Sequence, residues 1–377
     1  MTAPETTVLT TAELQAALRT AGLPPSPASP FASLAPPSSI APPVASALIQ
    51  KHVVNGSGAM TGTWRQALTA LTKPTHKASV FLGSPEQWFS MDYYAAGDTI
   101  TGCNSDDAGY KITPSVSRDS VEAVISEWLR LPAVASAQSP PIDLDAEEMT
   151  VFAAIVDAGR EESIRALIER RMPDLSRFTH DQLAAEVEWS SAQDGRWLCS
   201  VLRRHAPSVF APEGGGLGAG AKKLAARGWL RLGGEDAQIG ADLQARSVKL
   251  MNLNPYVALD FRATSGAASV VIVMTGIASF WAIELFGGPD GRPMARLFEL
   301  GGPEAAQLLG RYLAQLPAAP SWTAPTPAAA WTPPPSAPVA QPAMPVAPPA
   351  APACPNCRKA LQPGRLFCTG CGTKVAG

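Results

Sequence analysis

The predicted helices and strands of this chain occur twice in the same order, and this internal repeat limits the possible folds more than any other feature. Each copy opens with a helix start in which a capping residue precedes an acidic first turn, at residues 9–13 and 144–148. Each copy closes with an amphipathic helix that ends in Leu-Pro, at Leu131-Pro132 and Leu316-Pro317. The repeat predicts two similar halves.

Each half also contains a helix that ends in paired leucines before a proline turn, followed by four strands with hairpin turns between them. The turns fall at Lys73-Pro74 and Asn254-Pro255. The strands are predicted at 78–82, 88–94, 99–104 and 110–116, and at 257–261, 269–274, 280–286 and 293–300. Because helices precede a run of strands, the predicted class is α+β: two quasi-repeated halves of antiparallel sheet with flanking helices.

The second half contains extra helices between residues 161 and 205. Apolar residues recur there at helical spacing, and we expect them to enlarge its core. They are Ile164, Leu167 and Ile168, followed by Leu183, Val187 and Trp189.

A run of 18 residues without a charge, 266–283, has the length of a membrane span. It is rich in β-branched residues and is interrupted at Thr275-Gly276, and its counterpart in the first half carries Asp92 and Asp98. We therefore predict two buried strands joined by a turn, and no membrane span.

Composition favours a folded chain without a nucleic-acid partner. Hydrophobic residues make up 46% of the chain and charged residues 16%, and the formal net charge is −2. The segment from Cys354 carries four basic residues and no acidic one, so the rest is more acidic than the whole. The first residues have no basic start and no apolar stretch, so we expect no export signal and a cytoplasmic protein.

The body, 9–317, resembles the EspG family of type VII (ESX) secretion chaperones. The leucine pair before Lys73-Pro74, the strand at 78–82, the hairpin strands and the Leu-Pro helix ends carry this resemblance. It implies a fold of two quasi-symmetric halves and a non-enzymatic cytoplasmic chaperone that holds a small helical secreted protein. A proline-rich insertion at 24–43 and the C-terminal tail depart from the family pattern, and no binding residue is carried over.

The tail contains the one motif with a defined chemistry. Two Cys-x2-Cys turns are separated by ten residues, a spacing that lets four thiolates close a tetrahedral zinc shell with bonds of about 2.3 Å. Few apolar residues surround them, so metal binding must supply the folding free energy. The four zinc ligands are Cys354, Cys357, Cys368 and Cys371. A closed shell of this kind is structural, and we predict a zinc ribbon.

Four segments follow from these patterns. They are a first half at 9–131, a second half at 142–317, a Pro/Ala-rich linker at 318–353 that is disordered, and the zinc ribbon at 354–377.

No catalytic constellation is evident. Cys103 and Cys199 are expected to be buried thiols, and the four histidines (His52, His76, His180 and His205) are scattered, with His180 at a capped helix start. The glycine-rich stretch 214–223 lacks the preceding strand and the Ser or Thr of a phosphate loop. Residues 217–253 resemble a winged helix, but its expected recognition helix carries only Arg246 and Lys249.

We therefore predict a non-catalytic protein-binding module, a chaperone or adaptor that holds a helical secretion substrate while its tethered zinc ribbon contacts a second protein. The alternative is a regulatory adaptor that binds nucleic acid through the ribbon or the winged-helix-like segment. An enzyme is the third possibility. The sequence leaves the oligomeric state and the partner-binding residues open.

Overall fold

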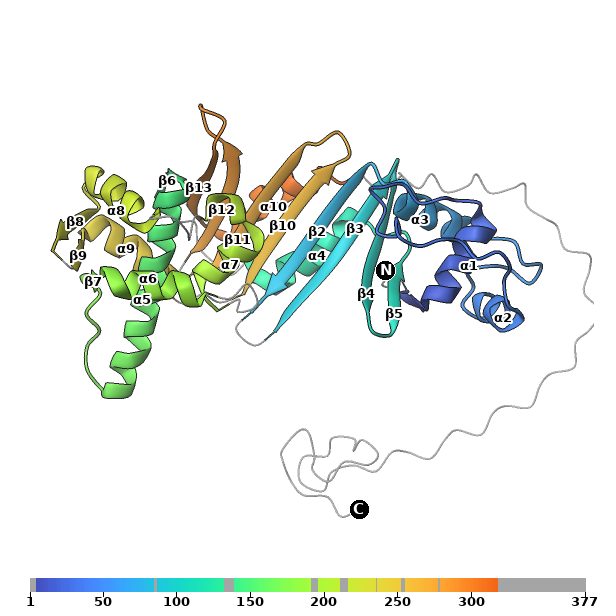
Figure 1. Cartoon of the computed structure of the whole chain (residues 1–377), viewed down its shortest axis with the longest axis horizontal. Helices are drawn as coiled ribbons and strands as arrows, with labels where there is room; N and C mark the ends of the chain where they lie inside the picture. The colour runs from blue at the N-terminus through green and yellow to red at the C-terminus, as the bar shows by residue number, and fades with distance from the viewer. Residues whose placement is uncertain are drawn as a thin grey trace, which may run out of the picture. The chain divides into compact units, whose positions relative to one another are not determined.

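One antiparallel sheet of ten strands forms the centre of the computed structural model (Figure 1). The structure describes residues 5–84, 87–131, 139–190, 196–210, 216–234, 236–251, 255–276 and 279–317, which belong to a single unit, Met1–Ser321. The strands lie in the order β1-β5-β4-β3-β2-β10-β11-β12-β13-β6. Their bounds are β1 Thr7–Leu9, β2 His76–Gly83, β3 Trp88–Ala96, β4 Thr99–Asp106, β5 Gly109–Thr113, β6 Ser139–Asp145, β10 Tyr256–Ala263, β11 Ala268–Thr275, β12 Phe280–Gly287 and β13 Pro293–Leu300.

Helices precede and follow the strands in each half. The first half has α1 Thr11–Ala21, α2 Pro42–Gln50, α3 Gly62–Thr72 and α4 Arg118–Leu129. The second half has α5 Ala146–Glu169, α6 His180–Trp189, α7 Leu198–His205, α8 Gly216–Ala226, α9 Ala241–Leu250 and α10 Gly302–Leu313. A small sheet of three strands lies among the second-half helices, in the order β7 Arg177–Thr179, β9 Asp236–Ile239 and β8 Leu230–Gly233.

The two halves meet in the middle of the large sheet, where β2 pairs with β10 and Val80 lies opposite Leu259. Outward from this pair the same succession of strands is found on both sides: β3, β4, β5 and β1 in one direction, and β11, β12, β13 and β6 in the other. The predicted α+β class and its antiparallel halves are confirmed. Both halves build one sheet instead of two.

The outermost strands, β1 and β6, were not predicted from the sequence. β1 has only three residues, which pair with β5, and β6 begins with Ser139-Pro140-Pro141. Proline has no backbone N–H for a neighbouring strand, so a pattern containing it does not read as a strand except at an edge. Both strands come directly before the capped helices α1 and α5, which extends the repeat by one element.

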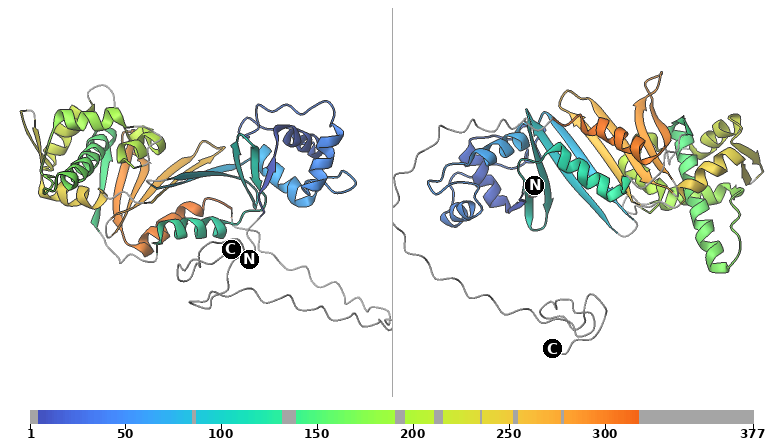
Figure 2. Two further views of the ribbon diagram at one scale, coloured as in Figure 1. Left: turned by 90° about the horizontal axis from the view of Figure 1, so that it is seen from below. Right: turned by 180° about the vertical axis from the view of Figure 1, so that it is seen from behind.

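Helices cover the two faces of the sheet unevenly (Figure 2). On one face α4 and α10 lie side by side, and Ile125 and Leu309 share a core with Val80 and Leu259. On the other face the helices gather at the two ends of the sheet. There α1 and α3 cover β4 and β5, and the second-half helices cover β12 and β13.

The uncharged run from 266 to 283 forms the paired strands β11 and β12, as predicted. Val273 and Ala282 lie opposite each other in this pair and are fully buried. Within the described part of the chain, no helix has both the length and the apolar character needed to cross a membrane.

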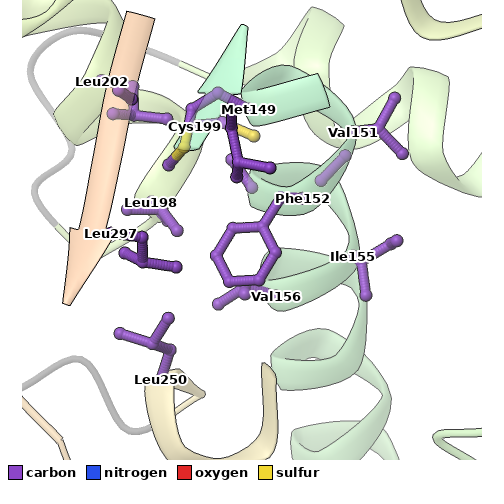
Figure 3. Close-up of a cluster of buried hydrophobic side chains, with 14 of the residues drawn as sticks. Met149, Val151, Phe152, Ile155, Val156, Leu198, Cys199, Leu202, Leu250 and Leu297 are labelled. Carbon is purple, nitrogen blue, oxygen red and sulfur yellow. The ribbon is translucent and has the colours of Figure 1, made fainter. Parts of the chain in front are cut away.

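The largest core lies between α5 and the strands β12, β13 and β6 (Figure 3). Phe152 of α5 lies at its centre among Leu198, Leu250 and Leu297, and all four side chains are almost completely buried. Because α5 is surrounded here, its first half is buried on every side.

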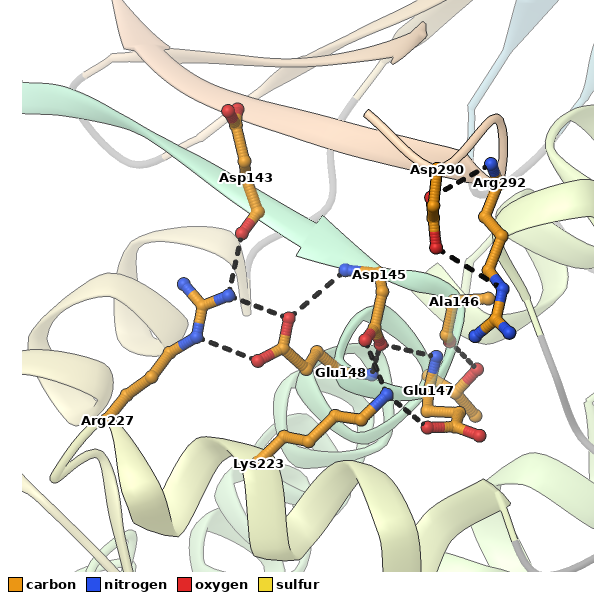
Figure 4. Close-up of polar contacts among 10 residues, drawn as sticks. Asp143, Asp145, Ala146, Glu147, Glu148, Lys223, Arg227, Asp290 and Arg292 are labelled. Carbon is orange, nitrogen blue, oxygen red and sulfur yellow. Dashed lines mark hydrogen bonds and ion pairs between the residues drawn. The ribbon is translucent and has the colours of Figure 1, made fainter. Parts of the chain in front are cut away.

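Ion pairs fix the start of α5 to α8 (Figure 4). Asp145 and Glu148 form the predicted capping box, and the Arg227 guanidinium donates to both carboxylate oxygens of Glu148 at 2.7 and 2.8 Å. Lys223 pairs with Asp145 at 2.6 Å. A matching capping box between Thr10 and Glu13 starts α1. A capping box of the same kind therefore begins the first helix of each half.

Candidate partner-binding surface at the end of helix α5

The last turns of α5 expose a set of large apolar side chains. Every residue from Glu148 to Gly159 is buried, whereas beyond Gly159 only Ala166 is. The side chains of Leu167, Ile168 and Met172 are 79%, 76% and 86% exposed, and that of Ile164 is 46% exposed. We refer to Ile164, Leu167, Ile168 and Met172 as the α5 apolar surface.

Ile164, Leu167 and Ile168 form one stripe because positions i, i+3 and i+4 of a helix lie on the same face, and Met172 lies in the loop beyond the helix end at Glu169. On the polar side of the helix, Glu162 binds the loop that follows α5. Arg171 donates to Glu162 Oε2 at 3.0 Å, and the backbone N–H of Asp174 donates to Glu162 Oε1 at 3.2 Å. The return loop is thereby bound to the face opposite the stripe, and Met172 is left beside it.

The structure corrects two predictions for this region. The extra helices do not begin at 161, because α5 continues as one helix to Glu169. Leu183 and Val187 are buried as predicted, but the α5 apolar surface and Trp189, which is 75% exposed, are not part of the core. The physical reason is that α6 packs on α5 nearer its buried part and the end of α5 extends beyond it (Figure 1). Helical periodicity marks an apolar stripe but not what covers it.

The uncovered stripe continues the face of α5 on which α6 and α7 pack. Asp157, on the same face, accepts hydrogen bonds from the backbone N–H groups of Leu198 and Cys199 at 2.7 and 2.8 Å, and so caps α7. One turn further on, Glu161 is hydrogen-bonded to Glu186 of α6. Among the described residues, no helix lies beside α6 on the end of α5, a position where a further helix could pack.

The pKa of Glu186 is raised to about 8, first by burial and then by the bond to Glu161 and the negative charges of Asp157 and Glu161, while Arg165 lowers it. In the unfolded chain the value is 4.5. A carboxyl whose pKa is higher in the folded state favours folding only while it is protonated. The packing of α6 on α5 therefore loses stability as the pH rises from about 4.5 to about 8.

We expect Glu186→Gln to reduce this pH dependence, because the amide stays neutral and can still donate to Glu161. The midpoint of thermal unfolding, followed by circular dichroism at pH 5 and pH 8, should fall less in the variant than in the parent. Glu188→Gln, at an exposed position of the same helix, is the control. Equal falls in parent and Glu186→Gln would show that Glu186 does not titrate as described.

Other sites considered from the sequence show no shared chemistry. Cys103 and Cys199 are buried free thiols in separate cores, as predicted, and burial is the first cause that raises the pKa of both. His205 is half-buried beside Tyr256, and His180 follows the cap residue Thr179. Among the described residues, no group of three or more His, Cys, Asp or Glu could hold a metal ion.

The four predicted zinc ligands, the linker and the ribbon all lie outside the described residues. Of the glycine-rich stretch, the part from Gly216 onward is the helix α8. In the winged-helix-like segment, Arg246 lies 3.5 Å from Asp242, and Lys249 pairs with Glu299 at 2.6 Å. The two cations of α9 are thus already paired within the fold, an arrangement that does not favour binding to a phosphate backbone.

No protein-family model and no curated protein sequence matches this chain. Among solved structures, it is similar to the Mycobacterium tuberculosis type VII secretion system chaperone EspG5, which was determined in complex with a PE25-PPE41 dimer. The identity is 12%, the match covers 83% of this chain and 96% of that one, and the TM-score is 0.42. At this identity the likeness concerns the fold alone.

Proposed function

We propose that this protein is a non-catalytic chaperone or adaptor that holds a helix of a partner protein against the α5 apolar surface. The observation that carries this proposal is the exposure of Leu167 and Ile168 on the projecting end of α5, together with that of Met172 in the loop that follows. Contiguous exposed apolar side chains of this size mark interaction sites on proteins. The partner class, a small helical secreted protein met in the cytoplasm, follows the resemblance of the chain to secretion chaperones.

A helix is the occupant that this surface fits best. The stripe at 164, 167 and 168 has the spacing of a ridge that packs into the groove of a second helix. It continues the face of α5 that α6 already covers, so a helix of the partner laid beside α6 would complete the layer. Side chains of Leu, Ile and Met on the partner would meet the stripe.

A photocrosslinking amino acid at position 168, in the organism that makes the protein, tests the site. We expect an adduct with one predominantly helical protein, and a much weaker adduct from position 124, which is exposed on α4. With that protein purified, Leu167→Asp should weaken binding at least tenfold in calorimetry, because it buries a carboxylate in an apolar contact. Val124→Asp is the matched control. Unchanged binding by Leu167→Asp would refute the site.

The tail supplies a second contact in the same proposal. Cys354, Cys357, Cys368 and Cys371 have the spacing of a closed zinc shell, and the segment before them, 318–353, has the composition of a flexible tether. A folded module on a tether raises the local concentration of whatever it binds. The ribbon would in this way bring a second protein to the body while α5 holds the first.

A further inference from the structure

The middle of the large sheet is open on one face. Between the helices gathered at its two ends, the side chains of β2, β3 and β10 line a cavity of about 460 Å³. Its floor is polar: Ser79 donates to Asp92 at 2.6 Å, Lys77 pairs with Asp92 at 2.8 Å, and Arg262 pairs with Asp260 at 2.8 Å. Because these groups satisfy one another, the strands need no covering helix here.

Arg204 of α7 is the exception among the charged groups of this cavity. Its guanidinium carbon lies 4.2 Å from the ring centre of Trp88 and 5.8 Å from that of Phe81. No hydrogen bond or ion pair joins the Arg204 side chain to another residue of the described ranges. The neighbouring His205 does not add charge, because burial and then the Arg204 cation lower its pKa to about 3.

A guanidinium that stacks on aromatic rings uses its flat faces and keeps its N–H groups, which point outward in the plane, for another partner. The two N–H groups of one edge match the two oxygens of a carboxylate. The cavity wall carries the cations Lys77, Arg204 and Arg262 and the carboxylates Asp92 and Asp260. This balance leaves one positive charge, which suits a monoanion and disfavours a doubly charged phosphate.

We propose that Arg204 is the receptor for a carboxylate side chain, of glutamate or aspartate, in a bound polypeptide. Trp88 is 51% exposed and offers an apolar contact to residues on either side of that acid. The site lies on the sheet and not on α5, so it does not depend on the helix-binding function proposed above. A polypeptide bound here would need an acidic residue at the position that meets Arg204.

The side-chain Nε–H signal of Arg204 in the ¹⁵N-labelled full chain is a direct probe. We would titrate a blocked alanine pentapeptide with a central glutamate, its glutamine counterpart, free glutarate and inorganic phosphate. The glutamate peptide should shift this signal with saturation, and the glutamine peptide should not. Arg204→Gln should weaken binding of the glutamate peptide at least tenfold when it is followed through backbone signals of β2 and β3. Arg204→Lys keeps the charge but cannot form two parallel hydrogen bonds to a carboxylate, so it should also bind several-fold more weakly.

Arg231→Gln removes the same charge from an exposed position on β8 and should bind as the parent does. Parent-like circular dichroism spectra and melting temperatures would show that the Arg204 variants are folded. The proposal is overturned if the glutamine peptide binds as well as the glutamate peptide, or if Arg204→Gln binds within twofold of the parent. Tighter binding of phosphate or glutarate than of the glutamate peptide would also overturn it, because the ligand would then not be a polypeptide.

Discussion

Purified protein is expected to contain one zinc ion per chain, and Cys371→Ser is expected to abolish its retention. Four thiolates close the predicted shell, and the tail has too few apolar residues to fold without the metal. Binding should therefore contribute on the order of 10 kcal/mol or more to the folding of this segment. Elemental analysis measures the stoichiometry, and the absorption of the cobalt-substituted protein reports tetrahedral thiolate ligands.

Cys103→Ser is the matched control, because Cys103 is buried in the body and should leave the zinc content unchanged. Chelation of the metal should make the four tail thiols reactive towards alkylating agents while the body keeps its melting temperature. Protein that is free of zinc after growth in supplemented medium, with tail thiols that react under native conditions, would rule the ribbon out.

Asp157→Ala is expected to lower the free energy of unfolding of the body by about 2–4 kcal/mol. Asp157 is fully buried, and its carboxylate accepts the first backbone N–H groups of α7 at Leu198 and Cys199. The residue in the cap position, Trp197, makes no side-chain capping bond, so α7 depends on a cap supplied by α5. Removal of the carboxylate leaves two buried donors without an acceptor, and chemical denaturation monitored by circular dichroism measures the loss.

Two further variants serve as comparisons for the stability loss of Asp157→Ala. Asp157→Asn retains one acceptor oxygen and should lose less stability than the alanine variant. Glu188→Ala, at an exposed acid of α6, should remain within about 0.5 kcal/mol of the parent. A loss below 1 kcal/mol in Asp157→Ala would show that another group or water caps α7.

The strands and capping boxes could be predicted because their signals are local. The strands β2 and β3 and the box formed by Asp145 and Glu148 depend on a few neighbouring residues, and the structure has them where the sequence indicated. The strands β1 and β6 could not be predicted in this way. Three residues or a Pro-Pro pair do not show alternation, and only the pairing with β5 and β13 makes them strands.

Helical periodicity predicted the helices, but it could not identify the candidate binding surface. Ile164, Leu167 and Ile168 have the periodicity of core residues, and spacing cannot distinguish a partner within the chain from one outside it. The Arg204 site left no sequence signal either, because Trp88, Phe81 and Arg204 come from three separate elements. An arginine that stacks on aromatic rings and has no ion pair among the described residues becomes visible only when the sheet and α7 are assembled.

The pairing of β2 with β10 has a consequence for how the protein is made. These strands are separated by more than 170 residues in the chain, so while the ribosome is still synthesising the second half, the eight residues of β2 present an open hydrogen-bonding edge. Because every copy carries the same β10, the β2 edge of one nascent copy can be completed by β10 of another, which is the route to an exchanged dimer. Slow translation of the region between the halves lengthens the interval in which this exchange can occur.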